Sequence, residues 1–372
     1  MGAGGASSRR RRFEHPDSGE GTNVKSSIQH CTWPARLAAV VLASIFAMSG
    51  AARAADPALI AAAEQEGQIV VYGGDISETP HQVKRFMELY PKIKATFVVA
   101  GGWQLYNRYM SEFSAGQAVA DVFTNVEDTL LTLDAGGHIA PYRPDAAKNF
   151  PADILVGNTV RTKLGYAALV ANTDQMKGLP VPDDWTSFAT PPKAWEDRIA
   201  YVDPRGSSVA FMVLAALVQN YGEEKTRQIY LGLKSMRSEV SMNTPGSVAK
   251  VVSGERPLMM YILTNHLGDA LRNGAPLEFK IPASGAIPFY FSAGVLKNAR
   301  HPNAAKLYLE FMLSEGQDVI ISRGEYALRN GAPAPQGLPP LDKVKLMHFD
   351  LTKALADQKK LIAWWQDVTG IQ

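Results

Sequence analysis

From residue 57 onward, short apolar runs alternate with amphipathic segments, and loops containing glycine separate them. Residues 68–72 form a continuous apolar run that ends at Gly73 and Gly74, as expected of a buried parallel strand. Residues 79–90 follow with apolar side chains at helical spacing. The same alternation continues as a strand at 95–99, a helix at 103–113, a strand at 121–124 and a helix at 127–135. This order predicts an α/β fold with a parallel sheet.

The alternation stops and restarts once, which predicts two lobes. A strand at 164–170 leads into a proline-rich segment at 179–195, and a second α/β unit begins with a strand at 198–202 and a helix at 209–219. Further strands are expected at 258–263 and 286–295, and further helices at 302–313 and 349–367. We therefore expect two doubly wound α/β lobes with a ligand cleft between them. The predicted boundaries are a leader at 1–54, lobe 1 at 55–165 with 285–372, and lobe 2 at 166–284.

The amino end has the pattern of an export signal. An apolar segment at 37–48 follows a basic stretch and precedes Ala52-Arg53-Ala54, a small-x-small cleavage pattern. The alternative is a membrane anchor, but the apolar segment is shorter than the roughly 20 residues that span a bilayer. We predict cleavage after Ala54 and a periplasmic protein. The pair Arg10-Arg11 lies far from the apolar segment, which favours the general secretory route over the twin-arginine route.

Removing the leader changes the charge and the cysteine content. The leader carries 7 of the 38 Lys and Arg residues and 3 of the 36 Asp and Glu residues, which leaves 31 basic against 33 acidic side chains. A slightly acidic chain without a basic stripe argues against nucleic-acid binding. The only cysteine, Cys31, lies in the leader, so the mature chain would hold no disulfide and no thiolate metal site.

The sequence lacks the common signatures of catalysis. It contains no Gly-x-Ser-x-Gly elbow, no P-loop and no dinucleotide-binding fingerprint. No two of its histidines after residue 54 lie at the helical i, i+4 spacing. We therefore predict no catalytic residues, no metal ligands and no cofactor.

The polar loops after the predicted strands are the better candidates for function, because open α/β sheets bind ligands at the carboxyl ends of their strands. Glycines there let a ligand approach the backbone, and helix N-termini attract anions. Arg205 adds a cation at a helix start, although this segment also reads as an ordinary helix cap. Trp103 is placed either to cover a ligand or simply to pack. The predicted ligand-binding residues are Gly74, Asp75, Ser77, Gly102, Trp103, Asn125, Arg205, Gly206, Ser207, Ser208, Asn243, Tyr261 and Asn265.

Several segments together resemble a known family. They are residues 61–72, Asp121-Val-Phe, Pro141-Tyr142, Val170-Ala-Asn-Thr173, residues 199–204, Ser253-Gly-Glu255, residues 301–306 and residues 311–317. In this order they resemble the solute-binding proteins of ABC importers in the ferric-iron-binding-like group, which have the type 2 periplasmic-binding fold. The resemblance covers roughly residues 57–340. It implies a monomeric clamp that delivers a small ligand to an ABC permease in the inner membrane.

The resemblance also bears on the ligand. Ferric-iron binders of this group use two neighbouring tyrosines in the second lobe, and the corresponding segment here, residues 264–269, contains none. Tyr261 lies nearby, but a hard ferric ion needs several oxygen ligands. We therefore expect an organic ligand with a carboxylate or phosphate group. The alternatives are a ferric-iron receptor and a periplasmic enzyme on the same scaffold.

Overall fold

The computed structural model describes residues 55–75 and 78–372. The predicted export signal, its cleavage site and Ser77 lie outside these residues. Residues 52–372 belong to one compact unit. Within the described part of the chain, no helix is both long enough and apolar enough to cross a bilayer.

Strands and helices alternate much as the sequence predicts. The first part contains α2 (Pro57–Glu66), β1 (Gln68–Gly73), α3 (Thr79–Leu89), β2 (Lys94–Val99), α4 (Gly102–Ser114), β3 (Val122–Val126), α5 (Glu127–Ala135), β4 (Leu155–Val156) and β5 (Thr159–Asn172). The middle part contains β6 (Ile199–Val202), α6 (Ser208–Ser235), β7 (Glu239–Ser241), α7 (Thr244–Ser253), β8 (Leu258–Leu263), α8 (Thr264–Arg272) and β9 (Leu277–Lys280). The last part contains β10 (Ile287–Val295), α9 (Pro302–Met312), α10 (Glu315–Ser322), β11 (Tyr326–Ala327), α11 (Leu351–Ala356) and α12 (Gln358–Thr369).

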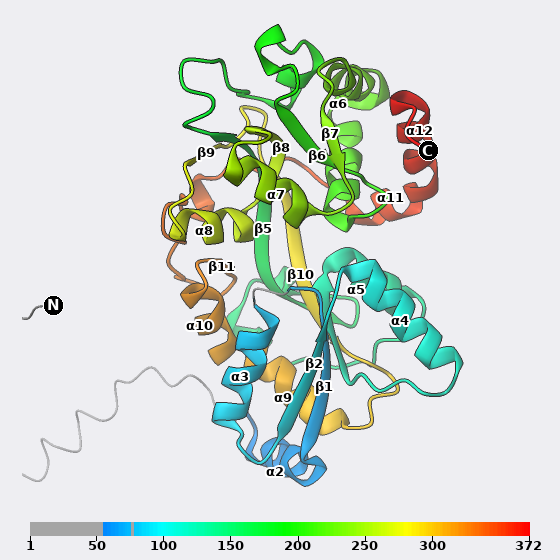
Figure 1. The fold of residues 1–372 in the computed structure, drawn as a ribbon. Coiled ribbons are helices and arrows are strands. Elements are labelled where there is room, and N and C mark those ends of the chain that lie inside the picture. Colours follow the sequence, from blue (N-terminus) through cyan, green and yellow to red (C-terminus); the bar gives the residue numbers. More distant parts are fainter. Residues whose placement is uncertain (1–54, 76–77) are drawn as a thin grey trace, which may run out of the picture. The chain divides into compact units, whose positions relative to one another are not determined.

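The strands form two α/β lobes on one continuous path of hydrogen-bonded strands, in the order β2-β1-β3-β10-β5-β8-β6-β7. In the first lobe β1 pairs in parallel with β2 and β3, and in the second β6 pairs in parallel with β7 and β8. The long strands β5 and β10 are antiparallel to each other and run between these two groups (Figure 1). The predicted two-lobed α/β fold is confirmed, and the path through β5 joins the lobes.

Local sequence features explain where individual helices begin and end. Asp56 accepts a hydrogen bond from the backbone N–H of Ala58, and Gly67 ends α2 with a φ of 68°. Helix α6 is longer than the predicted 209–219 and runs on past a kink at Gly222, where φ is 79°. The segment expected as one helix at 349–367 is two helices, because Asp357 both ends α11 and precedes α12.

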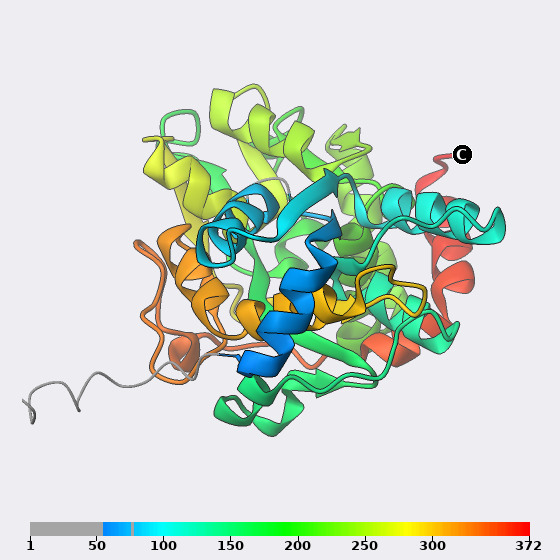
Figure 2. The ribbon, with the colours of Figure 1, turned by 90° about the horizontal axis from the view of Figure 1, so that it is seen from below.

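Apolar packing joins segments that are distant in the sequence. Helix α2 lies beside α9 in the first lobe, where Ala63 and Ala304 belong to the same buried cluster (Figure 2). Helices α11 and α12 pack on α6, and Leu361 and Trp365 belong to the core of the second lobe. The C-terminal helices thus pack with lobe 2, although the predicted boundaries assign residues 285–372 to lobe 1. The other two predicted boundaries, after residues 165 and 284, fall within β5 and just before β10, the two strands that run between the lobes.

Candidate ligand-binding site

Three of the predicted residues in the first lobe are in close contact. Asn125 lies at the end of β3 and is 2 % exposed. A Cβ atom added to Gly74 would lie 2.2 Å from Asn125 Nδ2, and one added to Gly102 would lie 2.8 Å from Asn125 Oδ1. Only glycine therefore fits at both positions while Asn125 keeps its place. Asn125 Oδ1 accepts from the Val126 N–H, but Nδ2 has no hydrogen-bond partner among the described residues.

The first turn of α5 adds a buried carboxyl group beside Asn125. Asp128 is fully buried, and its Oδ1 accepts a hydrogen bond from the Thr129 N–H at 2.7 Å. Its Oδ2 has no hydrogen-bond partner within the described chain. Burial raises the pKa of the Asp128 carboxyl to about 7, against the opposing influence of the Ser208 hydroxyl from α6. The methyl of Thr129, the next residue, would lie 3.2 Å from a Cβ at Gly102, so the first turn of α5 lies next to the loop that contains Gly102.

The second lobe contributes a group of hydroxyls. Tyr261 on β8 is 1 % exposed, and its OH has no hydrogen-bond partner of good geometry in the described residues. Burial raises its pKa, whereas the nearby hydroxyls of Thr244 and Ser207 oppose that rise. Ser207 also caps α6, since its Oγ accepts from the Ala210 N–H. These hydroxyls stand at the starts of α6 and α7, where backbone N–H groups point outward.

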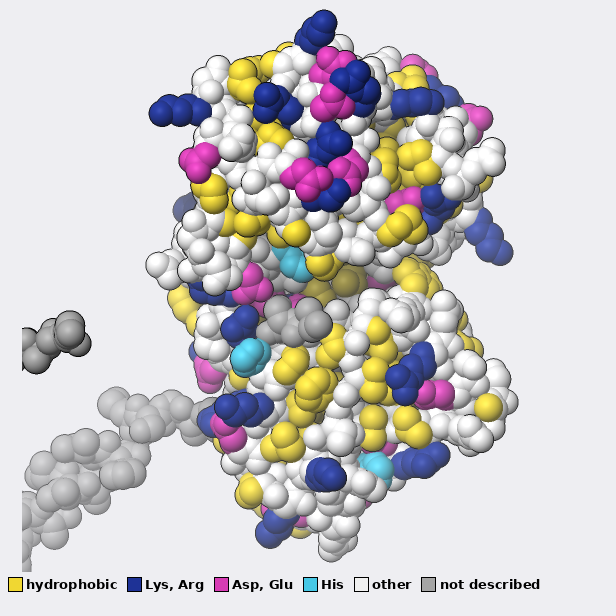
Figure 3. Space-filling model, viewed as in Figure 1, with side chains coloured by type: hydrophobic (Ala, Val, Ile, Leu, Met, Phe, Trp, Pro, Cys, Tyr) yellow, Lys and Arg dark blue, Asp and Glu magenta, His cyan; other side chains and the backbone are white. Residues whose placement is uncertain are grey.

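Contacts across the lobes bring these two groups together. Ser208 of α6 lies beside Asp128 of α5, and the Asn265 amide of α8 donates to Asp75 Oδ2 at 3.5 Å. Asn265 Oδ1 is buried without a partner among the described residues. Figure 3 shows a hollow in the surface between the lobes, at the level where β5 and β10 pass from one lobe to the other.

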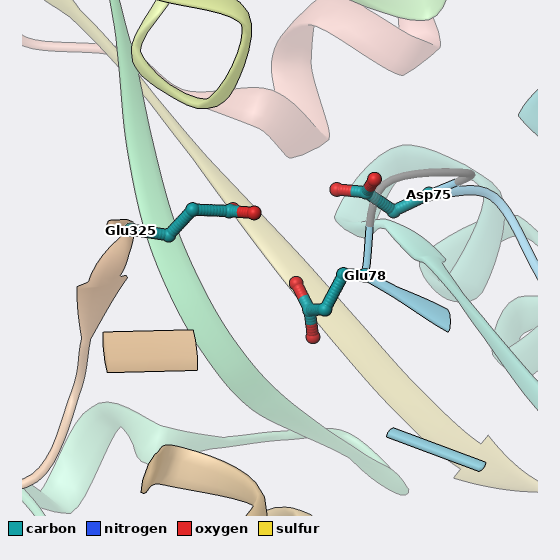
Figure 4. A group of neighbouring side chains, drawn as sticks. All are labelled: Asp75, Glu78 and Glu325. Atoms are coloured by element: carbon teal, nitrogen blue, oxygen red, sulfur yellow. The ribbon is translucent and has the colours of Figure 1, made fainter. Parts of the chain in front are cut away.

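A buried cluster of charges lies beside this region. Asp75, Glu78 and Glu325 direct their carboxylates toward one another (Figure 4), with ligand atoms within 4.8 Å of each other. Such a trio could hold a metal ion, but the ammonium of Lys163 forms ion pairs with all three carboxylates. The distance from Lys163 Nζ to Asp75 Oδ2 is 2.6 Å. Lys163 therefore takes the position that a cation would occupy.

The pKa values in this cluster follow from burial and charge. Burial lowers the pKa of Lys163, but the three carboxylates outweigh it and hold that pKa well above its usual range. Burial raises the pKa of Glu325 to about 8 despite the attraction of Lys163. Burial also lowers the pKa of His266, which follows Asn265 in α8. The cluster thus carries more carboxylates than cations and keeps one of them protonated near neutral pH.

Arg205 does not point into this region as an unpaired cation. Its guanidinium binds the buried carboxylate of Asp203, with Arg205 Nη2 2.7 Å from Asp203 Oδ2. It also lies over the ring of Trp365, 5.6 Å from the ring centroid. The helix start that it precedes nevertheless brings the Ser207 hydroxyl near Tyr261 and the Ser208 hydroxyl near Asp128.

The remaining predicted residues make contacts within the fold that the structure describes. Gly206 packs against Met242, whose carbonyl oxygen would lie 2.5 Å from an added Cβ. Asn243 caps α7 by accepting from the Gly246 N–H. Trp103 is half-buried and packs edge-on against Tyr106, with ring centroids 5.3 Å apart. Each of these three has a structural role in the fold, and their contact with a ligand stays a prediction.

Sequence reasoning missed several residues of this region. Asp128 carried a usable signal, because it lies in the first turn of a helix that follows a buried strand directly. Thr244 carried the same signal after β7. No signal in the sequence pointed to Lys163, Glu78 and Glu325, because their ion pairs join three segments that are distant in the sequence.

Comparisons with known proteins agree with this fold. A family model described as bacterial extracellular solute-binding protein matches residues 119–352. An uncharacterized protein of Haemophilus influenzae is 28% identical over 340 residues, covering 86% of this chain and 95% of that protein. The major ferric iron-binding protein of Neisseria meningitidis serogroup B is 26% identical, covering 79% of this chain and 91% of its own. The periplasmic binding protein AfuA from Actinobacillus pleuropneumoniae, solved with fructose-6-phosphate, aligns with a TM-score of 0.74 at 23% identity, covering 82% and 99% of the two chains.

Proposed function

This chain belongs to the bacterial extracellular solute-binding protein family, and from that premise we propose that it is a periplasmic receptor for a small organic anion. The ligand would carry a carboxylate or phosphate group and would be handed to the permease of an ABC importer. Solute-binding proteins of this family deliver ligands to such permeases, and the chain's similar proteins are binding proteins rather than enzymes.

The observation that carries this proposal is a set of buried polar atoms without partners at the junction of the lobes. They come from β3, α5, β8 and α8, and they are Asn125 Nδ2, Asp128 Oδ2, Tyr261 OH and Asn265 Oδ1. A buried polar group left without a hydrogen bond costs about 1–3 kcal/mol. Four such groups at the ends of strands from both lobes are best explained by a ligand that supplies their partners.

Helix termini favour an anion at this place. Helices α4, α6, α7 and α8 begin at the carboxyl ends of β2, β6, β7 and β8. Helices α4 and α8 have no side-chain cap, so the first backbone N–H groups of both remain available. Positive helix ends and outward N–H groups together make an anion site. Because Arg205 is bound to Asp203, we propose that neutral donors and helix ends, rather than this arginine, hold the anion.

Ferric iron is the second candidate, because a 26% identical relative is a major ferric iron-binding protein and three carboxylates lie close together here. Two features weigh against it. The ammonium of Lys163 already lies among those carboxylates and pairs with all three, and a second cation beside it would be repelled. In addition, the phenol of Tyr261 is buried among hydroxyls on the other lobe.

Native mass spectrometry of protein purified without denaturation tests the two candidates directly, because it reports the mass of any retained ligand. We then expect calorimetry to show binding of fructose 6-phosphate, citrate or a related anion, and an Asn125→Ala or Tyr261→Phe variant to bind more weakly. A matched control is Asn158→Ala, since Asn158 lies in a turn bound to Asp134. Stoichiometric ferric iron with no response to organic anions would replace the proposal by the iron alternative.

A further inference from the structure

Asp128 is a carboxyl group in a position where a carboxylate is expected to repel an anionic ligand. We propose that Asp128 takes up a proton when the ligand binds and donates a hydrogen bond from Oδ2 to the anionic group of the ligand. This inference rests on the proposed function, because it concerns how the same site receives an anion. It makes binding of the ligand dependent on proton uptake.

The geometry leaves one oxygen of this carboxyl for the ligand. Oδ1 is held by the Thr129 N–H at 2.7 Å, whereas the fully buried Oδ2 has no partner of good hydrogen-bond geometry in the described residues, with the Ser208 hydroxyl of α6 nearby. Asn125, three residues earlier, likewise keeps its Nδ2 unpartnered beside Gly74 and Gly102. Two buried polar atoms without partners of good geometry, on residues three apart and one of them a donor, suit an oxygen-rich ligand group when the carboxyl oxygen is also a donor.

Among the described residues, the lysine and arginine side chains on the elements around Asp128 are already paired with other carboxylates. Its neighbour Glu127 is ion-paired with Arg161, at 2.6 Å. The charged groups on the other packed elements are engaged elsewhere, and they are Lys163 of β5 with its three carboxylates, Arg108 with Glu112 of α4, and Arg205 with Asp203 before α6. His348 and Asp350 line a cavity with Glu127 and Arg161. An anion beside Asp128 would therefore meet an uncompensated carboxylate unless that carboxylate is protonated.

Burial prepares Asp128 for this role. Burial already raises the pKa of its carboxyl to about 7 in the ligand-free protein. A negative charge brought next to a carboxyl raises its pKa further, because two like charges cannot both remain ionised at hydrogen-bond distance. The bound state therefore holds the proton at pH values where the free state has lost it.

Calorimetry with fructose 6-phosphate, citrate and sulfate as probes tests the inference between pH 7.5 and 9.0. Phosphate monoesters lose their second proton near pH 6, so they do not titrate in this range. Titrations in two buffers of different ionisation enthalpy give the number of protons taken up. We expect nearly one proton per ligand at pH 8, and an affinity that falls about tenfold for each pH unit.

The variant Asp128→Asn keeps the shape of the side chain and donates from the same position without titrating. We expect it to bind without proton uptake, with an affinity that no longer depends on pH. At pH 8.5 it would then bind about 30-fold more tightly than the parent protein. Glu325→Gln is the control, because Glu325 also titrates near this range but lies in the Lys163 cluster, and its proton uptake should match the parent's.

The outcomes separate the inference from the proposed function. Binding without proton uptake, or weaker binding by Asp128→Asn at every pH, overturns the inference alone, because the carboxylate would then accept a hydrogen bond from the ligand. If Glu325→Gln binds the ligand without proton uptake, Glu325 rather than Asp128 takes up the proton, and this result also overturns the inference. No binding of any anion at any pH overturns the proposed function and the inference with it.

Discussion

The two ends of the second lobe's parallel strands use polar residues in opposite ways. At the amino ends, charges at the surface pair with one another, as the exposed Arg237 does with Asp197 and the half-buried Arg256 does with Glu239. Figure 3 shows such charges of both signs interleaved on the face over β7 and α7. At the carboxyl ends, Tyr261 and its neighbouring hydroxyls are buried, and its OH remains without a partner. Polarity alone therefore does not mark a binding site, whereas buried hydrogen-bonding capacity that the chain does not satisfy does.

This contrast predicts that, of the substitutions considered, removing the buried ammonium of Lys163 changes the protein most, through the free energy of unfolding. Lys163→Met leaves Asp75, Glu78 and Glu325 buried without their counter-charge. We expect the free energy of unfolding at pH 7 to fall by about 3–5 kcal/mol, measured by urea denaturation. Lys148→Met, which removes an exposed partner of Asp145, should cost under about 1 kcal/mol. Equal losses in the two variants would show that burial does not distinguish the two kinds of ion pair.

The pH dependence of stability should reflect the same buried cluster. The carboxyl of Glu325 has a pKa of about 8 in the folded chain and 4.5 as its ordinary value, so the folded state binds this proton more tightly. Its contribution to stability is complete below pH 4.5 and is lost as the pH rises through 8, by at most about 1.4 kcal/mol per pH unit. In urea titrations Glu325→Gln should flatten this decline relative to the parent. An unchanged slope would contradict the assignment.

At the carboxyl ends of the first lobe's strands, we expect a substitution to change ligand affinity. The added methyl of Gly74→Ala would overlap Asn125 Nδ2, which must then leave its position. We expect ligand affinity to fall at least about 30-fold, equivalent to about 2 kcal/mol from a displaced donor and its lost partner. Calorimetry measures it, and Gly116→Ala, after α4, is a control for a glycine substitution away from Asn125, since its added Cβ meets no neighbour although φ is 68°. Unimpaired binding by Gly74→Ala would remove Asn125 from the site.

Tyr261→Phe tests whether the Tyr261 hydroxyl binds the ligand or stabilises the fold. Because the Tyr261 OH has no partner among the described residues, its removal should leave the stability of the ligand-free protein unchanged or slightly higher. The affinity for the ligand should fall about tenfold, as for the loss of one hydrogen bond. Thermal unfolding and calorimetry give the two values. A clear loss of stability without a change in affinity would make this hydroxyl structural.

The smallest effects are expected at the exposed amino ends. Arg237 and Asp197 are the two non-glycine residues with positive φ in the described chain, at 52° and 58°. Glycine tolerates this backbone conformation better than alanine does. Arg237→Gly should therefore be more stable than Arg237→Ala in urea titrations, and neither should alter ligand affinity. The opposite order would show that the ion pairs, rather than the backbone, set the stability there.

Periodicity predicted most of the secondary structure, because apolar spacing reports which side of an element is buried. Helix α5 begins and ends where the sequence analysis expected it, and β8 does too. The break at Asp357 was missed, because residues 351–369 keep helical spacing of apolar residues on both sides of it. The kink at Gly222 was missed as well, since a single glycine within a helical pattern is ambiguous.

The site was predictable only in part. Asn125 and Tyr261 were predicted because they lie near the carboxyl ends of strands, a position that the order of elements specifies, and their contact with a ligand stays a prediction. The pairing of Arg205 with Asp203 was not foreseen, although the two are only two residues apart, because a sequence does not show which way a guanidinium turns. The Lys163 cluster requires contacts between segments separated by more than 80 residues, which no local pattern encodes.

Because β5 runs through both lobes, the lobes are difficult to exchange between proteins by recombination or by engineering. Its residues pair with β10 along the first half and with β8 along the second, so a cut at the lobe boundary would leave backbone groups on both fragments without partners. Neither lobe is then a portable module that a gene fusion could move intact to another protein. Recombination that exchanges one lobe for that of a distant relative must also exchange, or exactly match, the shared strand.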